Sequence, residues 1–137
     1  MPDVYEHHRT VAAAEIDALG HANNIAYLEW MQAAALAHSA AQGWPGEAYQ
    51  RLGCGWVVRS HRIEYHSPAR FGEPIVVQTW VANMRKVTSL RRYRVVRGSD
   101  AELLATAETQ WAFIDFATGQ PKRIPPEIAS AFAVVDQ

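Results

Sequence analysis

The sequence lacks the features that mark secreted, membrane and nucleic-acid-binding proteins. One cysteine, Cys54, occurs among 137 residues, so an internal disulfide is excluded and a reducing compartment is indicated. No apolar run is long enough to span a bilayer, and the N-terminus has no secretory h-region. The formal net charge is −1, without the basic excess of a nucleic-acid-binding protein. We therefore predict a cytoplasmic protein whose partners include neither a membrane nor a nucleic acid.

Several catalytic and cofactor signatures are missing as well. There is no G-x-S-x-G, no P-loop and no dinucleotide fingerprint, which leaves serine-hydrolase and nucleotidase functions without support. Six histidines are scattered along the chain, and the pair His7 and His8 has no cysteine or carboxylate at ligand spacing. We expect neither a metal site nor an organic cofactor.

The composition is that of a globular domain. Apolar residues make up 49% of the chain and charged residues 20%, and 137 residues suffice for one domain with a sizeable core. No repeat, linker or low-complexity segment divides the sequence. We predict a single domain over residues 1–137.

The longest apolar stretch indicates a helix over residues 24–42. Few polar residues interrupt it, and a helix that is apolar on most faces is normally buried. Gly43 and Pro45 provide the stop signal, and Asn23 or Asn24 suits the N-cap. A short polar elbow, residues 17–24, precedes the helix, where backbone amides lack helical partners.

Most of the remaining chain has the pattern of β-strands. The predicted strands cover residues 4–16, 55–66, 74–84, 88–97 and 102–116, with short helices expected near 45–53 and 125–135. Short connections require antiparallel neighbours. The predicted class is α+β, with one five-stranded antiparallel sheet covered by one long central helix.

The elbow also carries a recognisable motif. Residues 17–29 have the pattern D-x-x-G-H-x-N-N-x-x-Y-L-E, which resembles the signature of hotdog-fold acyl-CoA thioesterases of the 4-hydroxybenzoyl-CoA thioesterase-like branch. Residues 63–75 and 104–125 resemble later segments of that family in the same order. The resemblance implies a sheet wrapped around one helix. It also implies a homodimer with active sites at the subunit interface, often assembled into a homotetramer.

The resemblance implies catalytic roles for two elbow residues. Asp17 matches the family's carboxylate, acting as nucleophile or general base, and Asn24 matches the position whose backbone N–H polarises the thioester carbonyl. Such roles suit the chemistry, because helix N-terminal amides carry partial positive charge and a thiolate leaves readily. An aspartate in a loop also serves commonly as a turn or capping residue. Some relatives have histidine where this chain has Asn24, so an Asp–His pair is absent at that spacing.

Four further residues in the motif have weaker claims. His21 could orient water or the substrate, or simply fix the elbow. Asn23 could contact substrate or Asp17, although capping is the simpler interpretation. Tyr27 could line the acyl pocket or belong to the core. Glu29 matches the motif too, and we interpret it as a structural glutamate.

Six of the thirteen basic residues lie between positions 85 and 97 with no acidic residue among them, and they are Arg85, Lys86, Arg91, Arg92, Arg94 and Arg97. A solvated strand face is the usual explanation for such a run. By resemblance, we assign Arg85 and Lys86, at a hairpin tip, to the phosphates of coenzyme A, and predict that Arg91 to Arg97 face solvent. Arg59 could face the partner subunit's site or an ordinary strand exterior.

The sequence thus predicts an acyl-CoA thioesterase. Two alternatives remain open: another hotdog enzyme, above all an acyl-carrier-protein thioesterase, and a non-catalytic module that binds acyl-CoA. The acyl group is left undefined, because aromatic and aliphatic chains are equally compatible with the apolar residues available.

Overall fold

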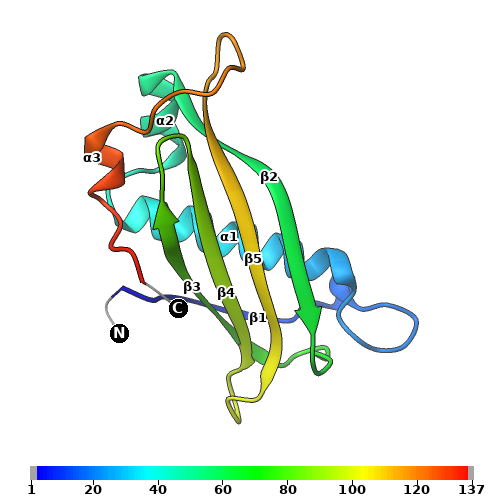
Figure 1. The fold of residues 1–137 in the computed structure, drawn as a ribbon. Helices are drawn as coiled ribbons and strands as arrows, with labels where there is room; N and C mark the ends of the chain where they lie inside the picture. Colours follow the sequence, from blue (N-terminus) through cyan, green and yellow to red (C-terminus); the bar gives the residue numbers. More distant parts are fainter. Residues whose placement is uncertain (1–2, 136–137) are drawn as a thin grey trace.

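A computed structural model describes residues 3–135, so the ends of the predicted domain, 1–2 and 136–137, lie outside the described residues. Figure 1 shows a sheet with a long helix across one face and two short helices gathered at one end. In chain order the elements are β1 (Tyr5–Thr10), the 3₁₀ turn η1 (Ala13–Glu15), α1 (Asn24–Ala41), α2 (Gly46–Leu52), β2 (Cys54–Tyr65), β3 (Pro74–Met84), β4 (Thr88–Arg97), β5 (Leu103–Asp115) and α3 (Pro126–Ala129).

The five strands form one sheet in the order β1-β3-β4-β5-β2, and every neighbouring pair is antiparallel. The helix α1 lies across this sheet, as Figure 1 shows. This arrangement confirms the predicted α+β class and the hotdog fold. Strands β1 and β2 form the two edges, so each has one side without a strand partner among residues 3–135.

The core lies between α1 and the sheet. Trp30 and Met31 on α1 pack with alternate residues of the strands, such as Val77 and Tyr93, all of them nearly inaccessible to solvent. A second cluster lies at the end of the sheet covered by α2 and α3, where Phe113 is fully buried. Burial of large apolar side chains is the main favourable contribution to folding.

The first predicted strand is too long. Strand β1 ends at Thr10, and residues 13–15 form the 3₁₀ turn instead of continuing to Ile16. The amide of Ala12 donates to Oε1 of Glu15 over 2.9 Å, and the amide of Val11 donates to the carbonyl of Glu73. These bonds turn the chain out of the sheet and lead it toward the elbow.

The helix is not buried on all sides, contrary to the prediction. One face packs on the sheet, whereas Ile25 and Leu36 on the opposite face are 67% and 64% exposed. The apolar composition of the helix therefore leaves an apolar outer surface on the single chain, which composition alone could not distinguish from complete burial.

A β-bulge in strand β2 changes which of its residues face the helix. The register with β5 shifts between Val58 and Ser60, with Arg59 as the extra residue. Upstream of the bulge, Trp56 packs against Phe113; downstream, Tyr65 packs against Tyr27 of the helix. Strand β2 therefore contacts both ends of the core. No helix in residues 3–135 is long and apolar enough to cross a membrane.

Candidate active site

The polar elbow is a tightly bonded loop. The amide of Asp17 donates to the carbonyl of His21 over 2.8 Å, and the amide of Gly20 donates to the carbonyl of Asp17 over 3.0 Å. Gly20 has φ of +82°, a left-handed conformation that glycine adopts without steric cost. The loop closes where the amide of Ala22 bonds to the carbonyl of Ala69. The elbow is thus held by its own backbone and by the β2–β3 connection.

The Asp17 carboxylate is fixed through one of its two oxygens. Oδ1 accepts from the amides of Leu19, at 2.9 Å, and His21, at 3.2 Å. Oδ2 makes no hydrogen bond with residues 3–135, and the side chain is exposed in the single chain. Asp17 therefore serves as the turn residue that the simpler interpretation required, while one oxygen stays available to a substrate or water.

The first turn of α1 follows the elbow directly in the chain. Asn23 is the N-cap, because its Oδ1 accepts from the amide of Ala26 over 2.8 Å. The capping interpretation of Asn23 is confirmed, and Asn24 is the first helical residue. In residues 3–135 the amides of Asn24 and Ile25 find no protein acceptor. Two donors with partial positive charge are thus free at the elbow.

Glu15 ties the elbow to the core. Its Oε2 accepts from Nε1 of the buried Trp30 over 2.8 Å, and Arg9 lies 3.6 Å from the same oxygen. Its carbonyl accepts from the amide of Asn23 over 2.8 Å. Sequence reasoning missed this residue, although an acidic residue two positions before the motif was visible.

The other predicted residues lie in different surroundings. Tyr27 belongs to the core, 3% exposed and packed against Trp30 and Tyr65, and burial raises its pKa. His21 is half-buried, and Glu29 points outward on the helix. Arg59 is exposed on the free edge of β2.

Arg85 and Lys86 occupy the β3–β4 connection as predicted. Both side chains are exposed, and the amide of Arg85 closes the turn by donating to the carbonyl of Thr88. The carbonyl of Lys86 accepts from the amide of Ile124, which joins this turn to the segment before α3. The turn is therefore braced while its two charges remain accessible.

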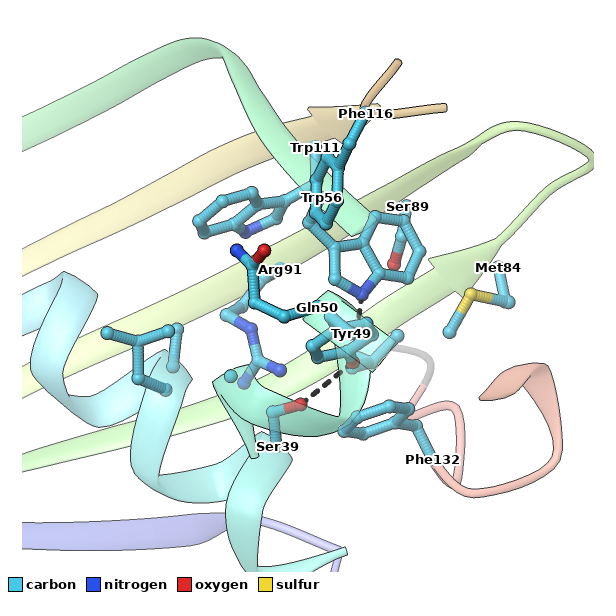
Figure 2. A pocket seen from close by; sticks show the side chains of 14 residues that line it. Ser39, Tyr49, Gln50, Trp56, Met84, Ser89, Arg91, Trp111, Phe116 and Phe132 are labelled. Carbon is cyan, nitrogen blue, oxygen red and sulfur yellow. Dashed lines mark hydrogen bonds between the residues drawn. The ribbon is translucent and has the colours of Figure 1, made fainter. Parts of the chain in front are cut away.

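A pocket of about 200 Å³ lies on the helix side of the sheet, at the end covered by α2 and α3. Figure 2 shows its aromatic side chains converging from β2, β5, α2 and the C-terminal segment. The residues that line it are Ala35, Leu36, Ser39, Gly46, Tyr49, Gln50, Trp56, Val81, Met84, Ser89, Arg91, Trp111, Phe116 and Phe132. Tyr49 Oη connects two of them, accepting from Nε1 of Trp56 and sharing a hydrogen bond with Ser39 Oγ.

Arg91 corrects the prediction that the basic run faces solvent. Its side chain is 6% exposed, on the inner face of β4 with Tyr93 and Val95, and it lines the pocket. Its Nη1 donates to Nδ1 of His38 at 2.9 Å and to Oγ1 of Thr79 at 3.0 Å. Burial lowers the pKa of His38 to about 4, and the neighbouring guanidinium adds to this effect.

Within the rest of the basic run, Arg97 also contradicts the prediction, because its side chain is only 11% exposed. Arg94 is exposed, Arg92 lies 3.7 Å from Glu108, and Arg97 pairs with Glu73, Asp100 and Glu102. Among residues 3–135, no ion pair links Arg91 to a carboxylate. Arg91 is therefore a buried cation with neutral partners. Nor does the described chain gather three potential metal ligands anywhere.

The elbow and the pocket lie at opposite ends of α1. Asn24 begins the helix and Ser39 lines the pocket, a separation of about 22 Å at the rise of an α-helix. The pocket of a single chain therefore does not adjoin its own Asp17.

Comparison with known proteins places this architecture in a family. Residues 11–132 match the family model of the thioesterase-like superfamily. The chain belongs to this superfamily, and the predicted class, a thioester hydrolase with the hotdog fold, is confirmed at that level.

Individual relatives agree with this assignment. The chain is 27% identical over 112 residues to the acyl-CoA thioester hydrolase YbgC of Escherichia coli, covering 82% of this chain and 81% of YbgC. It resembles the structure of Slr0204, a 1,4-dihydroxy-2-naphthoyl-CoA thioesterase from Synechocystis, with a TM-score of 0.88, 18% identity and 98% of each chain covered. A protein from Staphylococcus aureus, SAV2348, solved in complex with CoA, has a TM-score of 0.87 at 16% identity, over 93% of this chain and 80% of that one.

Proposed function

We propose that the protein is an acyl-CoA thioesterase in which Asp17 is the catalytic carboxylate. The observation that carries the proposal is the presence in one elbow of Asp17, fixed through Oδ1 with Oδ2 open, and of two amides at the start of α1 that have no acceptor among residues 3–135. The similarity to YbgC, named an acyl-CoA thioester hydrolase, supports the choice of substrate.

In the proposed reaction, the acyl C–S bond breaks and a C–O bond forms. In one route, Asp17 removes a proton from a water molecule while that water attacks the carbonyl carbon. In the other route, the Asp17 carboxylate itself attacks the carbonyl carbon and forms an anhydride, which water then cleaves. In both routes the products are a free acid and the CoA thiol, whose sulfur takes up the proton. The amide of Asn24 donates to the carbonyl oxygen as negative charge develops on it.

The complete site needs a second copy of the chain. Strand β2 has a free edge, which is exposed from Arg59 to Arg62. The Tyr65 end of this strand lies at the N-terminus of α1, and its Cys54 end lies at the pocket. If two β2 strands pair antiparallel about a two-fold axis, the Tyr65 end of one copy meets the Cys54 end of the other. In the homodimer that we propose, the elbow of each subunit approaches the pocket of its partner, the two sites are shared, and Arg59 is expected at the interface. Further pairing through the apolar outer face of α1 would give a homotetramer.

The test compares two aspartates in similar turns. Asp17→Asn should lower kcat/KM for acyl-CoA by roughly 100-fold or more, since the amide cannot act as base or nucleophile. Asp115→Asn is the matched control, because Asp115 Oδ1 likewise accepts from two amides, those of Ala117 and Thr118, in a turn outside the elbow, and Asp115 itself does not line the pocket. Thiol release from a panel of acyl-CoAs is followed with a thiol-reactive dye.

The outcomes separate the alternatives. Full activity in Asp17→Asn would show that the carboxylate is assigned wrongly. Tight binding of acyl-CoA without thiol release by the parent protein would indicate a binding module. Release from acyl-carrier-protein thioesters in preference to CoA thioesters would indicate the acyl-carrier-protein enzyme.

A further inference from the structure

We propose that Arg91 determines specificity by binding a carboxylate at the end of the acyl group remote from the thioester. This inference rests on the proposed function and specifies its substrate class: acyl groups derived from dicarboxylic acids. The supporting features are a buried cation without an acidic partner among residues 3–135, two neutral acceptors fixed on one of its nitrogens, and the apolar pocket that it lines.

No residue among 3–135 forms an ion pair with Arg91 that would compensate its charge. A guanidinium remains protonated in proteins, and placing it in an apolar interior is costly unless an anion accompanies it. Burial lowers the pKa of Arg91, which reflects this cost. Its hydrogen-bond partners, His38 and Thr79, are both neutral. A ligand carboxylate would therefore gain an ion pair that no residue among 3–135 provides.

The neutral partners hold the guanidinium in one orientation. Thr79 Oγ1 accepts from Arg91 and donates to the carbonyl of Arg92, so its hydroxyl is committed in both directions. His38 stacks against Tyr5 and meets Phe132 edge-on, which fixes its ring. The hydrogen bonds to His38 and Thr79 both involve Nη1 of Arg91. The Arg91 side chain extends toward Ser39 in Figure 2, at the wall of the pocket.

The remainder of the pocket suits the carbon chain of such a substrate. Trp56, Trp111 and Phe132 supply apolar surface around the buried cation. Apolar walls of this kind strengthen an ion pair by excluding water. A planar guanidinium can bind both oxygens of a carboxylate, which a neutral acyl terminus cannot match.

The test uses pairs of substrates of similar size that differ only at the acyl terminus, where one has a carboxylate and the other an uncharged group. Succinyl-, glutaryl- and adipoyl-CoA are each compared with the acyl-CoA in which an isopropyl group replaces the terminal carboxylate. For at least one chain length, the parent protein should show a kcat/KM ratio of roughly 10- to 100-fold in favour of the carboxylate. In Arg91→Met this ratio should fall to about one or below.

The ratio makes the test independent of partial misfolding, since loss of folded protein lowers both rates equally. Arg94→Met removes an exposed arginine from the opposite face of the same strand and should leave the ratio unchanged. A parent preference for the neutral substrate at every length, or an equal ratio in the parent and Arg91→Met, would overturn the proposal.

A binding experiment distinguishes failure of this inference from failure of the proposed function. Tryptophan fluorescence reports binding of the same substrate pairs to Asp17→Asn and to the double variant with Arg91→Met, without turnover. The ratio compared is the Kd of the neutral substrate divided by the Kd of the carboxylate substrate. If the parent hydrolyses no acyl-CoA but this ratio depends on Arg91, the thioesterase proposal fails and the carboxylate site stands. If hydrolysis occurs and neither ratio depends on Arg91, the carboxylate site alone is wrong.

Discussion

The guanidinium of Arg91 and the imidazole of His38 share one hydrogen bond of 2.9 Å, between Nη1 and Nδ1. Because arginine can only donate, Nδ1 of His38 must accept, and the ring is neutral with its proton on Nε2. Protonation of His38 would replace this bond by two adjacent buried cations. Burial and Arg91 together lower the pKa of His38 to about 4.

This relationship predicts a loss of stability in mild acid. The unfolded chain binds a proton at His38 near pH 6.5, whereas the folded protein resists it until about pH 4. The unfolded state therefore holds more protons between these values, and stability falls as the pH decreases through this window. From pH 7 to pH 5, His38 should reduce the free energy of unfolding by roughly 2 kcal/mol.

Urea denaturation at both pH values measures this effect. His38→Asn keeps an oxygen acceptor for Arg91 but cannot titrate. Its loss of stability from pH 7 to pH 5 should therefore be smaller than that of the parent by roughly 2 kcal/mol. Equal pH dependence in the two proteins would show that His38 is protonated without cost in the folded state.

Glu15 should be important for stability and for the position of the elbow. Glu15→Ala leaves the buried Nε1 of Trp30 and the amide of Ala12 without acceptors, which costs about 1–3 kcal/mol. Because the Glu15 segment also holds Asn23, the same variant should lower kcat for thioester hydrolysis. Thermal or urea unfolding and thiol release measure the two effects.

Glu64→Ala provides the control for this change. Its side chain is 60% exposed and pairs only at 3.6 Å with Arg62, so unfolding should change by less than about 0.5 kcal/mol. A Glu15→Ala protein as stable as Glu64→Ala would contradict the anchoring role of Glu15.

Arg85 and Lys86 should contribute to binding of the nucleotide part of coenzyme A. Replacing both by alanine should raise KM for acyl-CoA several-fold, because each removes a charge available to phosphate. For the same acyl group on N-acetylcysteamine, which has no phosphates, KM should not change. The effect should also weaken at high salt, since both side chains are exposed. Equal changes for the two substrates would place the phosphates elsewhere.

The sequence predicted most of the fold because its local signals agree. Asn23 marks the helix start, Gly43 and Pro45 mark its end, and alternating residues mark strands β3, β4 and β5 within one or two positions. The end of β1 was missed because it depends on contacts with Glu15 and Glu73, residues outside the strand. The bulge at Arg59 likewise depends on pairing with β5, which no property of β2 alone reveals.

The site was predicted in part. The motif located the elbow, but it could not show that Oδ1 of Asp17 is already engaged or that the pocket lies at the far end of the helix. The prediction for Arg91 is wrong because the basic run does not form one surface: Arg91 is buried and Arg94 is exposed. Its alternation with Tyr93 and Val95, both apolar and buried, was the signal that set it apart from Arg92 and Arg94.

Because the elbow and the pocket are far apart in one chain, we predict that an inactive variant and an unselective variant regain activity when they form a mixed dimer. In a dimer with shared sites, Asp17 of one subunit works with Arg91 of the partner. A mixed dimer of Asp17→Asn and Arg91→Met subunits then contains one site with both residues intact. If instead each chain used its own two residues, neither site of the mixed dimer would be complete.

Subunit exchange followed by thiol-release assays decides between these arrangements. With a carboxylate-terminated acyl-CoA, the mixture should recover up to about a quarter of the parent rate, because random exchange makes half of the dimers mixed and each has one intact site of two. Each variant alone should be far below this level. Mixing either variant with the double variant provides the control, since no dimer then contains an intact shared site. A mixture no more active than the average of its two components would show that the sites are not shared between subunits in this way.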